Sequence, residues 1–255
     1  MKKYIIILFG CLLFVSCSKK REKITSLSQL KDKRICVLTG SAGDLAARKV
    51  LPEAIFLDMV GSADAGLAVK TGKADAFIYD KSILRKITEK NPELIILEKP
   101  ISKLELAIAV NKENLKLISE LNAIISLLKN NGTLDSLKRK WVGENYPTPP
   151  QIPEIKNSGQ NGILKMGTCA IFEPYTFMAN GKYTGFDIEL STLLSKMLNK
   201  KIEIIDMSFE ALIPALQTGK IDFALSDFTV TEERKKLISF TEPYIANDIS
   251  VLVKK

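Results

Sequence analysis

The sequence contains no histidine, one tryptophan and four cysteines in 255 residues. Histidine is the commonest general base and metal ligand near neutral pH, so its absence argues against both catalysis and metal binding. The cysteines and carboxylates are not grouped at spacings that hold a metal ion. We therefore expect no catalytic residues, no metal and no cofactor. Cys36, in the apolar segment RICVL, and Cys169 are interpreted as small buried fillers rather than a disulfide pair.

The sequence also lacks an apolar run long enough to cross a bilayer, which takes about 20 residues. The first apolar run covers residues 4–15 and follows two basic residues, Lys2 and Lys3. A short apolar run behind a basic start is typical of a signal peptide, which we place at residues 1–16. The sequence therefore predicts an exported protein that faces the periplasm or the cell exterior.

The end of this run carries a second signal. Ser16 and Cys17 close it, and a small residue followed by cysteine resembles the lipobox of bacterial lipoproteins, in which the cysteine is acylated. Phe14 departs from that pattern, because leucine is usual three residues before the cysteine. We expect lipid attachment at Cys17 and a membrane tether over residues 17–25, with ordinary cleavage as the alternative.

The sequence does not gather its basic residues into a surface of the kind that binds nucleic acid. The net charge is +8, but basic residues alternate with acidic ones, as in LKDKR and TEERKK, and no basic cluster is interleaved with aromatic side chains. This pattern is typical of a solvated surface and argues against binding of nucleic acid. With 46% hydrophobic residues, the chain has enough apolar side chains for two lobes of about 100 residues each.

An internal repeat is the strongest positive feature. The peptide TGKADAFIYD at residues 71–80 recurs as TGKIDFALSD at residues 218–227. Upstream of each copy, apolar segments of strand length alternate with amphipathic segments of helix length. Before and within the first copy we expect strands at 34–38, 54–57 and 76–79 and helices at 44–51 and 62–70. Before the second copy we expect strands at 164–167 and 201–205 and helices at 186–198 and 209–217.

Each half of the chain is thus a β-α-β-α-β unit. Strands that alternate with helices of this length predict an α/β fold with a mostly parallel sheet flanked by helices. Ligands of such sheets bind beyond the carboxyl ends of the strands. Two such lobes facing one another would form a cleft.

Two longer segments resemble family 3 of the bacterial extracellular solute-binding proteins, the amino-acid-type binding proteins of ABC transporters. Residues 208–244, from SFEAL to FTEPY, resemble the first lobe of that family. Residues 26–143, from SLSQLKDKRICVLTGSAG to GTLDSLKRKWVG, resemble its second lobe and closing helices. In the family the first lobe comes first, whereas here it comes last. The resemblance implies a two-lobed periplasmic-binding-protein-like (type II) fold in circularly permuted order.

The permuted order suggests a division of the chain. We expect the second lobe at residues 26–106, the returning hinge strand and closing helices of the first lobe at 107–146, a proline-rich linker at 147–162, and the first lobe with a hinge strand at 163–255. Apolar strands at 105–110 and 249–253 stand where the family's chain crosses between lobes, and helices at 114–129 and 134–141 match its closing helices. We expect a monomer, while a domain-swapped dimer or a fragment of a tandem protein would give the same order.

The resemblance also implies the poles of a ligand site. Arg234, in TVTEERKK, matches the arginine that binds the ligand α-carboxylate, for which a guanidinium fork is well suited. Thr229 matches the threonine that donates to the same carboxylate. Asp80 matches the carboxylate that pairs with the α-ammonium group, although an aspartate there also suits the N-cap of the following helix. Ser41 and Ala42 lie in a glycine-rich loop before a helix, which would attract the carboxylate from the other lobe.

Other candidate residues concern the ligand side chain. Phe172 and Phe209 match aromatic walls of the family's pocket. Cys169 stands where the family often has an aspartate for cationic side chains, which argues against Lys, Arg or His as ligand. Asp227, next to Ser226, replaces a small residue and would add a second ammonium partner, narrow the pocket or repel an acidic ligand.

These features predict a lipid-anchored receptor that captures a neutral or aromatic amino acid by lobe closure and delivers it to an ABC permease. Two alternatives remain at this point. The first is an enzyme similar to the cyclohexadienyl dehydratases, with Glu173 as the general acid. The second is a sensory module that binds a partner protein.

Overall fold

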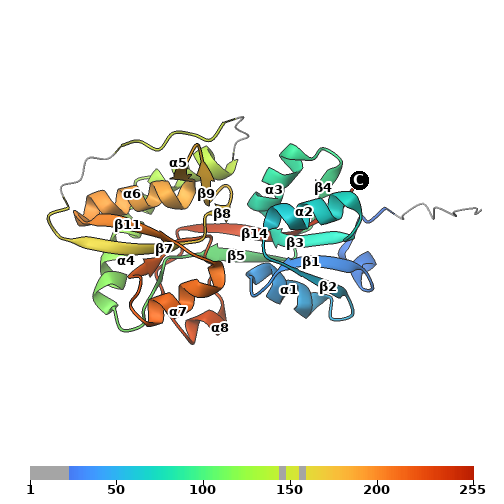
Figure 1. The fold of residues 1–255 in the computed structure, drawn as a ribbon, viewed down its shortest axis with the longest axis horizontal. Helices are drawn as coiled ribbons and strands as arrows, with labels where there is room; N and C mark the ends of the chain where they lie inside the picture. Colours follow the sequence, from blue (N-terminus) through green and yellow to red (C-terminus); the bar gives the residue numbers. More distant parts are fainter. Residues whose placement is uncertain (1–22, 144–147, 155–158) are drawn as a thin grey trace, which may run out of the picture.

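The computed structural model describes residues 23–143, 148–154 and 159–255. The predicted signal peptide, Cys17 and parts of the linker lie outside these residues. Two lobes lie side by side, and each consists of a β-sheet with helices on both faces (Figure 1). In the described part of the chain, no helix is both long and apolar enough to span a membrane.

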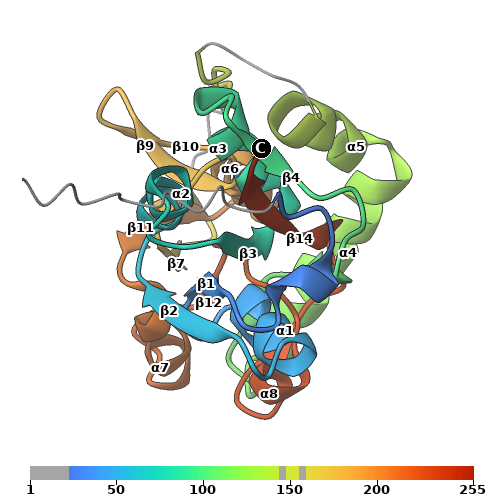
Figure 2. The same cartoon turned by 90° about the vertical axis from the view of Figure 1, so that its right-hand side faces the viewer.

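The second lobe is formed mainly by the N-terminal part of the chain. Its elements are η1 (Leu27–Leu30), β1 (Arg34–Leu38), α1 (Ala42–Val50), β2 (Ile55–Met59), α2 (Ser62–Thr71), β3 (Ala76–Asp80), α3 (Lys81–Lys90), β4 (Leu94–Ile96) and β5 (Ser102–Leu106). β2, β1 and β3 are parallel neighbours in that order. α1 lies on one side of this sheet and α2 and α3 lie on the other (Figures 1 and 2). The central strands are buried on both faces, which explains their uninterrupted apolar sequences.

The first lobe has the same plan. Its elements are β6 (Ala109–Val110), α4 (Leu115–Asn130), α5 (Thr133–Lys138), the π-helical turn η2 (Arg139–Gly143), β7 (Ile163–Thr168), β8 (Ile171–Phe172), β9 (Thr176–Ala179), β10 (Lys182–Thr184), α6 (Phe186–Leu198), β11 (Lys201–Asp206), η3 (Phe209–Ala211), α7 (Leu212–Gln217), β12 (Phe223–Ala224), α8 (Glu232–Lys235) and β13 (Ser239–Phe240). β11, β7 and β12 are parallel neighbours, and β6 and β13 continue the sheet. β8, β9 and β10 form a separate small antiparallel sheet.

Each sheet is completed by a strand from the other half of the chain. β14 (Ile245–Lys254), at the C-terminus, lies antiparallel between β3 and β4 of the second lobe and also pairs with β5. β6, from the N-terminal half, lies antiparallel between β12 and β13 of the first lobe. β14 and β5 run through the centre of the molecule between the lobes (Figure 1). The sheets are therefore mixed, with a parallel trio at the core of each.

The repeat of the sequence has a clear structural basis. Gly72 and Gly219 follow α2 and α7 with φ of 78° and 70°, the left-handed conformation in which helices commonly end. Asp75 and Asp222, three residues later, each accept a hydrogen bond from a backbone amide at the start of the first strand of their lobe, at 3.0 Å and 2.6 Å respectively. The two copies thus perform the same task, ending a helix and anchoring the next strand beside the first.

The closing helices of the N-terminal half pack on the first lobe, as expected. Trp141 in η2 is fully buried, and its indole Nε1 donates to Glu189 Oε2 of α6 at 2.7 Å. Lys140 Nζ donates to the same oxygen at 2.6 Å. These contacts fix residues that precede the linker against a helix that follows it.

Most of the expected helices and strands are present within two residues of their predicted ends. The hinge strand expected at 249–253 is longer, because β14 begins at Ile245. Its first half pairs with β5 and its second half with β3 and β4 of the second lobe. The chain therefore crosses between the lobes along the paired strands β14 and β5 (Figure 1). The small sheet of β8, β9 and β10 has no counterpart in the prediction, since its strands are too short to show periodicity.

Candidate ligand-binding site

A small cavity lies between the lobes, at the carboxyl ends of the parallel strands. It is lined by Ser41, Ala42, Gly43, Tyr79, Asp80, Leu104, Phe209, Asp227, Thr229 and Arg234. Its volume is about 10 Å³, which is room for about one water molecule. Seven of the ten residues predicted for the site line this cavity.

Arg234 provides the positive pole of the site. It lies in α8, a short helix capped by Thr231, whose Oγ1 accepts from the Arg234 backbone amide at 3.2 Å. The guanidinium stacks on the rings of Phe209 and Phe228, with Cζ 5.1 Å and 4.8 Å from the ring centroids. Burial lowers the pKa of Arg234 to about 10, so the side chain remains cationic at neutral pH. With its face against these rings, Arg234 also lines the cavity.

The same side chain already connects the two lobes. Nη1 donates to the carbonyl oxygen of Thr229 in the first lobe at 2.7 Å. Nη2 donates to the carbonyl oxygen of Gly40 in the second lobe at 3.1 Å. The lobes are therefore in contact at the residue that the sequence predicts to bind a carboxylate.

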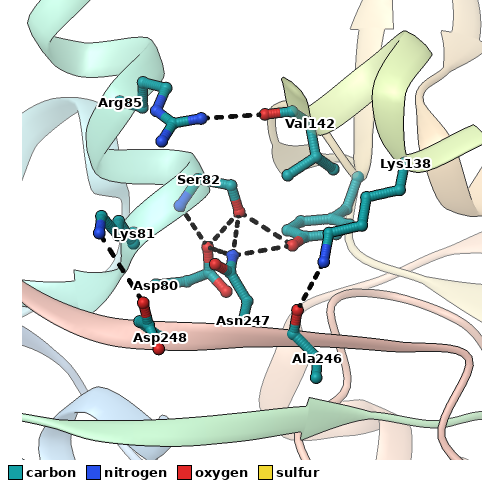
Figure 3. A network of polar contacts seen from close by, with 10 residues as sticks. Asp80, Lys81, Ser82, Arg85, Lys138, Val142, Ala246, Asn247 and Asp248 are labelled. Carbon is teal, nitrogen blue, oxygen red and sulfur yellow. Dashed lines mark hydrogen bonds and ion pairs between the residues drawn. The ribbon is translucent and has the colours of Figure 1, made fainter. Parts of the chain in front are cut away.

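Asp80 provides the negative pole and caps a helix at the same time. Its Oδ1 accepts from the amides of Ser82 at 2.7 Å and Ile83 at 3.4 Å, at the start of α3. Asn247 of β14 donates to the same oxygen at 2.8 Å, and the Ser82 hydroxyl also contacts it (Figure 3). Asp80 can therefore cap α3 and still bind an α-ammonium group, because the cap uses Oδ1 and Oδ2 has no hydrogen bond among the described residues.

A network of polar side chains packs against Asp80 on the side of β14. The hydroxyls of Ser82 and Tyr175 lie 2.9 Å apart, and Asn247 Nδ2 donates to the Tyr175 oxygen at 3.2 Å (Figure 3). Tyr175 belongs to the first lobe, between β8 and β9, and is fully buried. The network therefore connects both lobes and the hinge strand β14 directly behind the carboxylate.

The glycine-rich loop around Ser41 and Ala42 approaches the cavity. Gly40 has φ of 70°, and Ser41 is the N-cap of α1, with its Oγ accepting from the Asp44 amide at 3.1 Å. The amides of Ala42 and Gly43 lie in the first turn, where an α-helix provides no acceptor. A Cβ on Gly43 would lie 2.7 Å from the carbonyl oxygen of Ile78, so glycine lets α1 approach β3 closely.

Asp227 occupies an unusual conformation at the first-lobe side of the cavity. Its φ is 51°, in the left-handed region that few non-glycine residues adopt. Its backbone amide donates to Asp187 Oδ2 at 2.8 Å, and Tyr244 donates to Asp187 Oδ1 at 2.9 Å. Asp187, at the start of α6, therefore holds the loop that carries Asp227.

Burial raises the pKa of these carboxyl groups. Desolvation is the largest cause for each, and it raises the pKa of Asp80 and Asp187 to about 6. Hydrogen bonds oppose the shift in both cases. The pKa of Asp227 is raised well above its usual range by desolvation and then by the charges of Asp80 and Asp187, against the attraction of Arg234.

Three predicted residues lie outside the cavity lining. Phe172 packs behind it, edge-on to Phe209 at 5.8 Å between ring centroids and 6.3 Å from Tyr79. Cys169 is buried and follows β7, and its amide donates to Ser226 Oγ at 2.9 Å. These residues position the wall of the site in this closed arrangement.

Several residues of the site were not predicted. Asp187, Tyr175, Tyr244, Tyr79 and Asn247 all contact the site or hold residues that line it. For Asp187 a signal existed, because an acidic residue stands in the apolar segment FDIEL. Glu173, the candidate general acid of the enzyme alternative, forms an ion pair with Lys90 at 2.7 Å. Among the described residues, no group of three or more potential ligands could hold a metal ion.

Comparison with known proteins agrees with this geometry. Residues 164–255 match the model of the bacterial extracellular solute-binding proteins, family 3. These residues are therefore similar to that family. The match falls late in the chain, which is consistent with the predicted permuted order, and the two-lobed α/β fold was predicted from the same resemblance.

Individual relatives match over part of their length. The arginine-binding extracellular protein ArtP of Bacillus subtilis is 37% identical over 98 residues, 38% of each chain. The ABC transporter glutamine-binding protein GlnH of Bacillus subtilis is 32% identical over 127 residues, 49% of this chain and 46% of the relative. A solved ancestral arginine-binding protein bound to arginine is 48% identical over 33% of this chain and 38% of its own, with a TM-score of 0.33. The chain thus spans less than half the length of these relatives, whose names are those of binding proteins.

Proposed function

We propose that this protein binds an α-amino acid between its lobes and delivers it to an ABC importer. The observation that carries the proposal is the placement of Arg234 and Asp80, one cation and one carboxylate from opposite lobes, on the lining of one cavity. An α-amino acid carries a carboxylate and an ammonium group a few ångströms apart. A ligand that contacts both poles favours the closed arrangement over the open one.

The small volume of the cavity fits this mode of capture. A space of about 10 Å³ does not admit an amino acid. The lobes therefore have to separate for a ligand to enter, and the Arg234 Nη2 bond to the Gly40 carbonyl breaks as they do. The ligand carboxylate would then accept the Arg234 Nη2 hydrogen bond in place of the Gly40 carbonyl oxygen.

The predicted preference for neutral or aromatic ligands rested on Cys169 and Asp227. Cys169 does not line the closed cavity, whereas Asp227 does. Phe209 lines it as an aromatic wall, while Phe172 lies behind. We retain an α-amino acid as the proposed ligand class, and Asp227 becomes the residue that distinguishes among side chains.

Export and anchoring belong to the same proposal. ArtP is named as an extracellular protein, which supports a location outside the cytoplasm. The anchor at Cys17 would hold the second lobe near the membrane surface, since Lys23 leads into η1 of that lobe. Loss of membrane association in a Cys17→Ala variant, measured by fractionation, would support the anchor, and unchanged membrane association would contradict it.

We further propose that the protein acts as a monomer. Both hinge segments and both lobes come from one chain, and each sheet receives a strand from the other half of that chain. Size-exclusion chromatography with light scattering should give the mass of one chain and calorimetry one ligand per chain. A ligand-binding dimer without an active monomer would favour the domain-swapped alternative.

A thermal-shift panel with the twenty common amino acids tests the binding function. At least one amino acid should raise the melting temperature of the wild type, because it binds the folded state alone. Arg234→Ala and Asp80→Asn should lose most of this increase, since removing one partner of a buried charged contact costs about 2–5 kcal/mol of binding.

Lys235→Ala is the matched control, because Lys235 follows Arg234 in α8 and points to solvent, where it pairs with Glu232. This variant should respond as the wild type does. If Arg234→Ala and Asp80→Asn also respond like the wild type, the proposed site is wrong. If no amino acid stabilises the wild type, the partner-binding alternative gains support.

A further inference from the structure

Asp80 and Asp227 occupy equivalent positions in the two lobes. Each is the last residue of its repeat copy, TGKADAFIYD and TGKIDFALSD. The preceding residues behave alike in both copies, because the Asp75 and Asp222 amides each donate to the first strand of their lobe at 2.8 Å. The two carboxylates therefore follow equivalent strands, and both line the cavity between the lobes.

Each of these carboxylates has one oxygen without a partner. Asp80 Oδ1 accepts from Ser82 and Asn247, as Figure 3 shows, whereas Asp80 Oδ2 is buried and has no hydrogen bond among the described residues. Asp227 Oδ1 is likewise buried and without a partner in the described part of the chain. A buried polar atom of this kind is costly unless a ligand or water binds it.

The charges around the cavity do not balance for a neutral amino acid. The ligand carboxylate would pair with Arg234 and its α-ammonium with Asp80. Asp187 is already served by the Asp227 amide and the Tyr244 hydroxyl. Asp227 then remains as an additional buried carboxylate, facing Asp80, Asp187, Tyr79 and the single cation Arg234. A second cationic group on the ligand would offset the charge of Asp227.

The placement of Asp227 also limits where that second cation lies. Asp227 lines the same small cavity as the α-ammonium partner Asp80, so the two ligand cations would be close together. Cys169, at the position where the resemblance places an acid for long cationic side chains, carries no carboxylate and lies outside the lining. A cation on the β- or γ-carbon fits this arrangement, and one at the end of a long chain does not.

We propose that the site selects amino acids with a second ammonium group on a short side chain, of which L-2,4-diaminobutyrate is a representative, and that Asp227 binds this group. The inference rests on the proposed amino-acid-binding function. It replaces the preference for neutral or aromatic side chains with one for short diamino acids.

The test compares two ligands of the same size. L-norvaline has a methyl group where L-2,4-diaminobutyrate has its side-chain ammonium. By titration calorimetry near pH 7.5, the wild type should bind diaminobutyrate at least about tenfold more tightly than norvaline, as expected for one buried charge-assisted contact. Asp227→Asn keeps the shape of the side chain and should bring the ratio of the two affinities close to one.

Two further arms separate the possible outcomes. Lysine should bind more weakly than diaminobutyrate. Stronger binding of lysine would contradict the proposed preference for a short cationic side chain. The preference for diaminobutyrate should decrease as the pH is lowered, because the raised pKa of Asp227 makes its carboxyl take up a proton at a higher pH than an ordinary aspartate does. An unchanged ratio of affinities in Asp227→Asn would overturn the role of Asp227.

The same measurements distinguish this failure from failure of the proposed function. If norvaline and the common amino acids bind, and Arg234→Ala weakens them, while diaminobutyrate has no advantage, only the present inference is wrong. If none of these compounds binds the wild type, the proposed function itself is wrong, and this inference fails with it.

Discussion

Arg234 and Gly40 are 194 residues apart in the sequence, yet the guanidinium of one donates to the backbone carbonyl of the other across the cleft at 3.1 Å. The contact uses a donor that a ligand carboxylate would need. Closure without a ligand and closure around a ligand therefore compete for the same N–H group. The planar fork of arginine matters here, because it serves Thr229 and the opposite lobe at once.

This relationship predicts a strong effect of Arg234→Lys. Lysine keeps the positive charge but has no fork, so it cannot contact Thr229 and a ligand carboxylate in the same way. We expect at least a tenfold loss of amino-acid affinity by titration calorimetry, about 1.4 kcal/mol or more. Lys235→Arg, the reverse change at the neighbouring exposed position, should leave the affinity unchanged. Equal affinities of wild type and Arg234→Lys would contradict the bidentate role.

Asn247 gives a second prediction, because it holds the Asp80 carboxylate from the hinge strand (Figure 3). Asn247→Leu has a similar size but donates no hydrogen bond, so Asp80 loses a contact worth about 1.5–3 kcal/mol. Affinity for an amino acid should fall about tenfold or more. The control is Asp248→Asn, which removes only the more exposed contact to Lys81 at 3.8 Å. Equal losses in the two variants would show that Asn247 acts only through stability.

Local sequence patterns were sufficient for the main elements, whereas the two charged poles were predicted from the resemblance to a known family. β1, α3 and α6 are long or strongly apolar enough for periodicity to locate them. Arg234 and Asp80 could be assigned to facing lobes because the motifs around them resemble segments from different lobes of the solute-binding family. The sequence repeat alone predicts that the two lobes contain equivalent strands.

The support behind these poles could not be predicted, since it depends on side chains that meet only in the fold. Asn247 contacts Asp80 over 167 positions of sequence, and Tyr175 meets Ser82 over 93. Nothing in the local sequence of β14 distinguishes Asn247 from any polar strand residue. The left-handed conformation of Asp227 was equally hidden, because it is imposed by the bond from its amide to Asp187.

Gly185 offers a test of how the site's support is packed. Its φ is 123°, and a Cβ there would lie 2.2 Å from the Tyr175 carbonyl oxygen. Gly185→Ala should lower the free energy of unfolding by about 2–4 kcal/mol, since strain and a backbone clash add. Gly219→Ala is the control, because Gly219 has φ of 70° but no atom within 4 Å of its Cβ position. It should cost only about 1–2 kcal/mol.

Both glycine variants can be followed by urea unfolding with the fluorescence of Trp141, the single tryptophan. Trp141 is fully buried and held by Glu189, so its emission should change on unfolding. A loss of stability in Gly185→Ala no greater than that in Gly219→Ala would mean that Tyr175 moves aside without cost.

The buried carboxyl groups predict an unusual dependence of stability on pH. The pKa values of Asp80 and Asp187 are raised to about 6 in the folded protein, and burial raises that of Asp227 well above its ordinary range. The unfolded chain releases these protons near pH 4. Between that pH and the folded pKa values, the folded state binds more protons, so these groups stabilise the protein at low pH and lose this effect as the pH rises through about 6.

Asp227→Asn isolates this contribution. The amide cannot ionise, and the loss of one charge also relieves Asp80 and Asp187. The variant should therefore be more stable than the wild type at pH 7.5, and this gain should become smaller as the pH is lowered. Half-buried acids such as Glu93, whose pKa is lowered by its hydrogen bonds, act in the opposite direction but equally in both proteins. The difference in the free energy of unfolding between Asp227→Asn and the wild type therefore reflects the buried Asp227 carboxyl. An equal difference at both pH values would show that Asp227 gains its stability effect from shape and not from charge, and would remove the electrostatic basis for its selection of a cationic ligand.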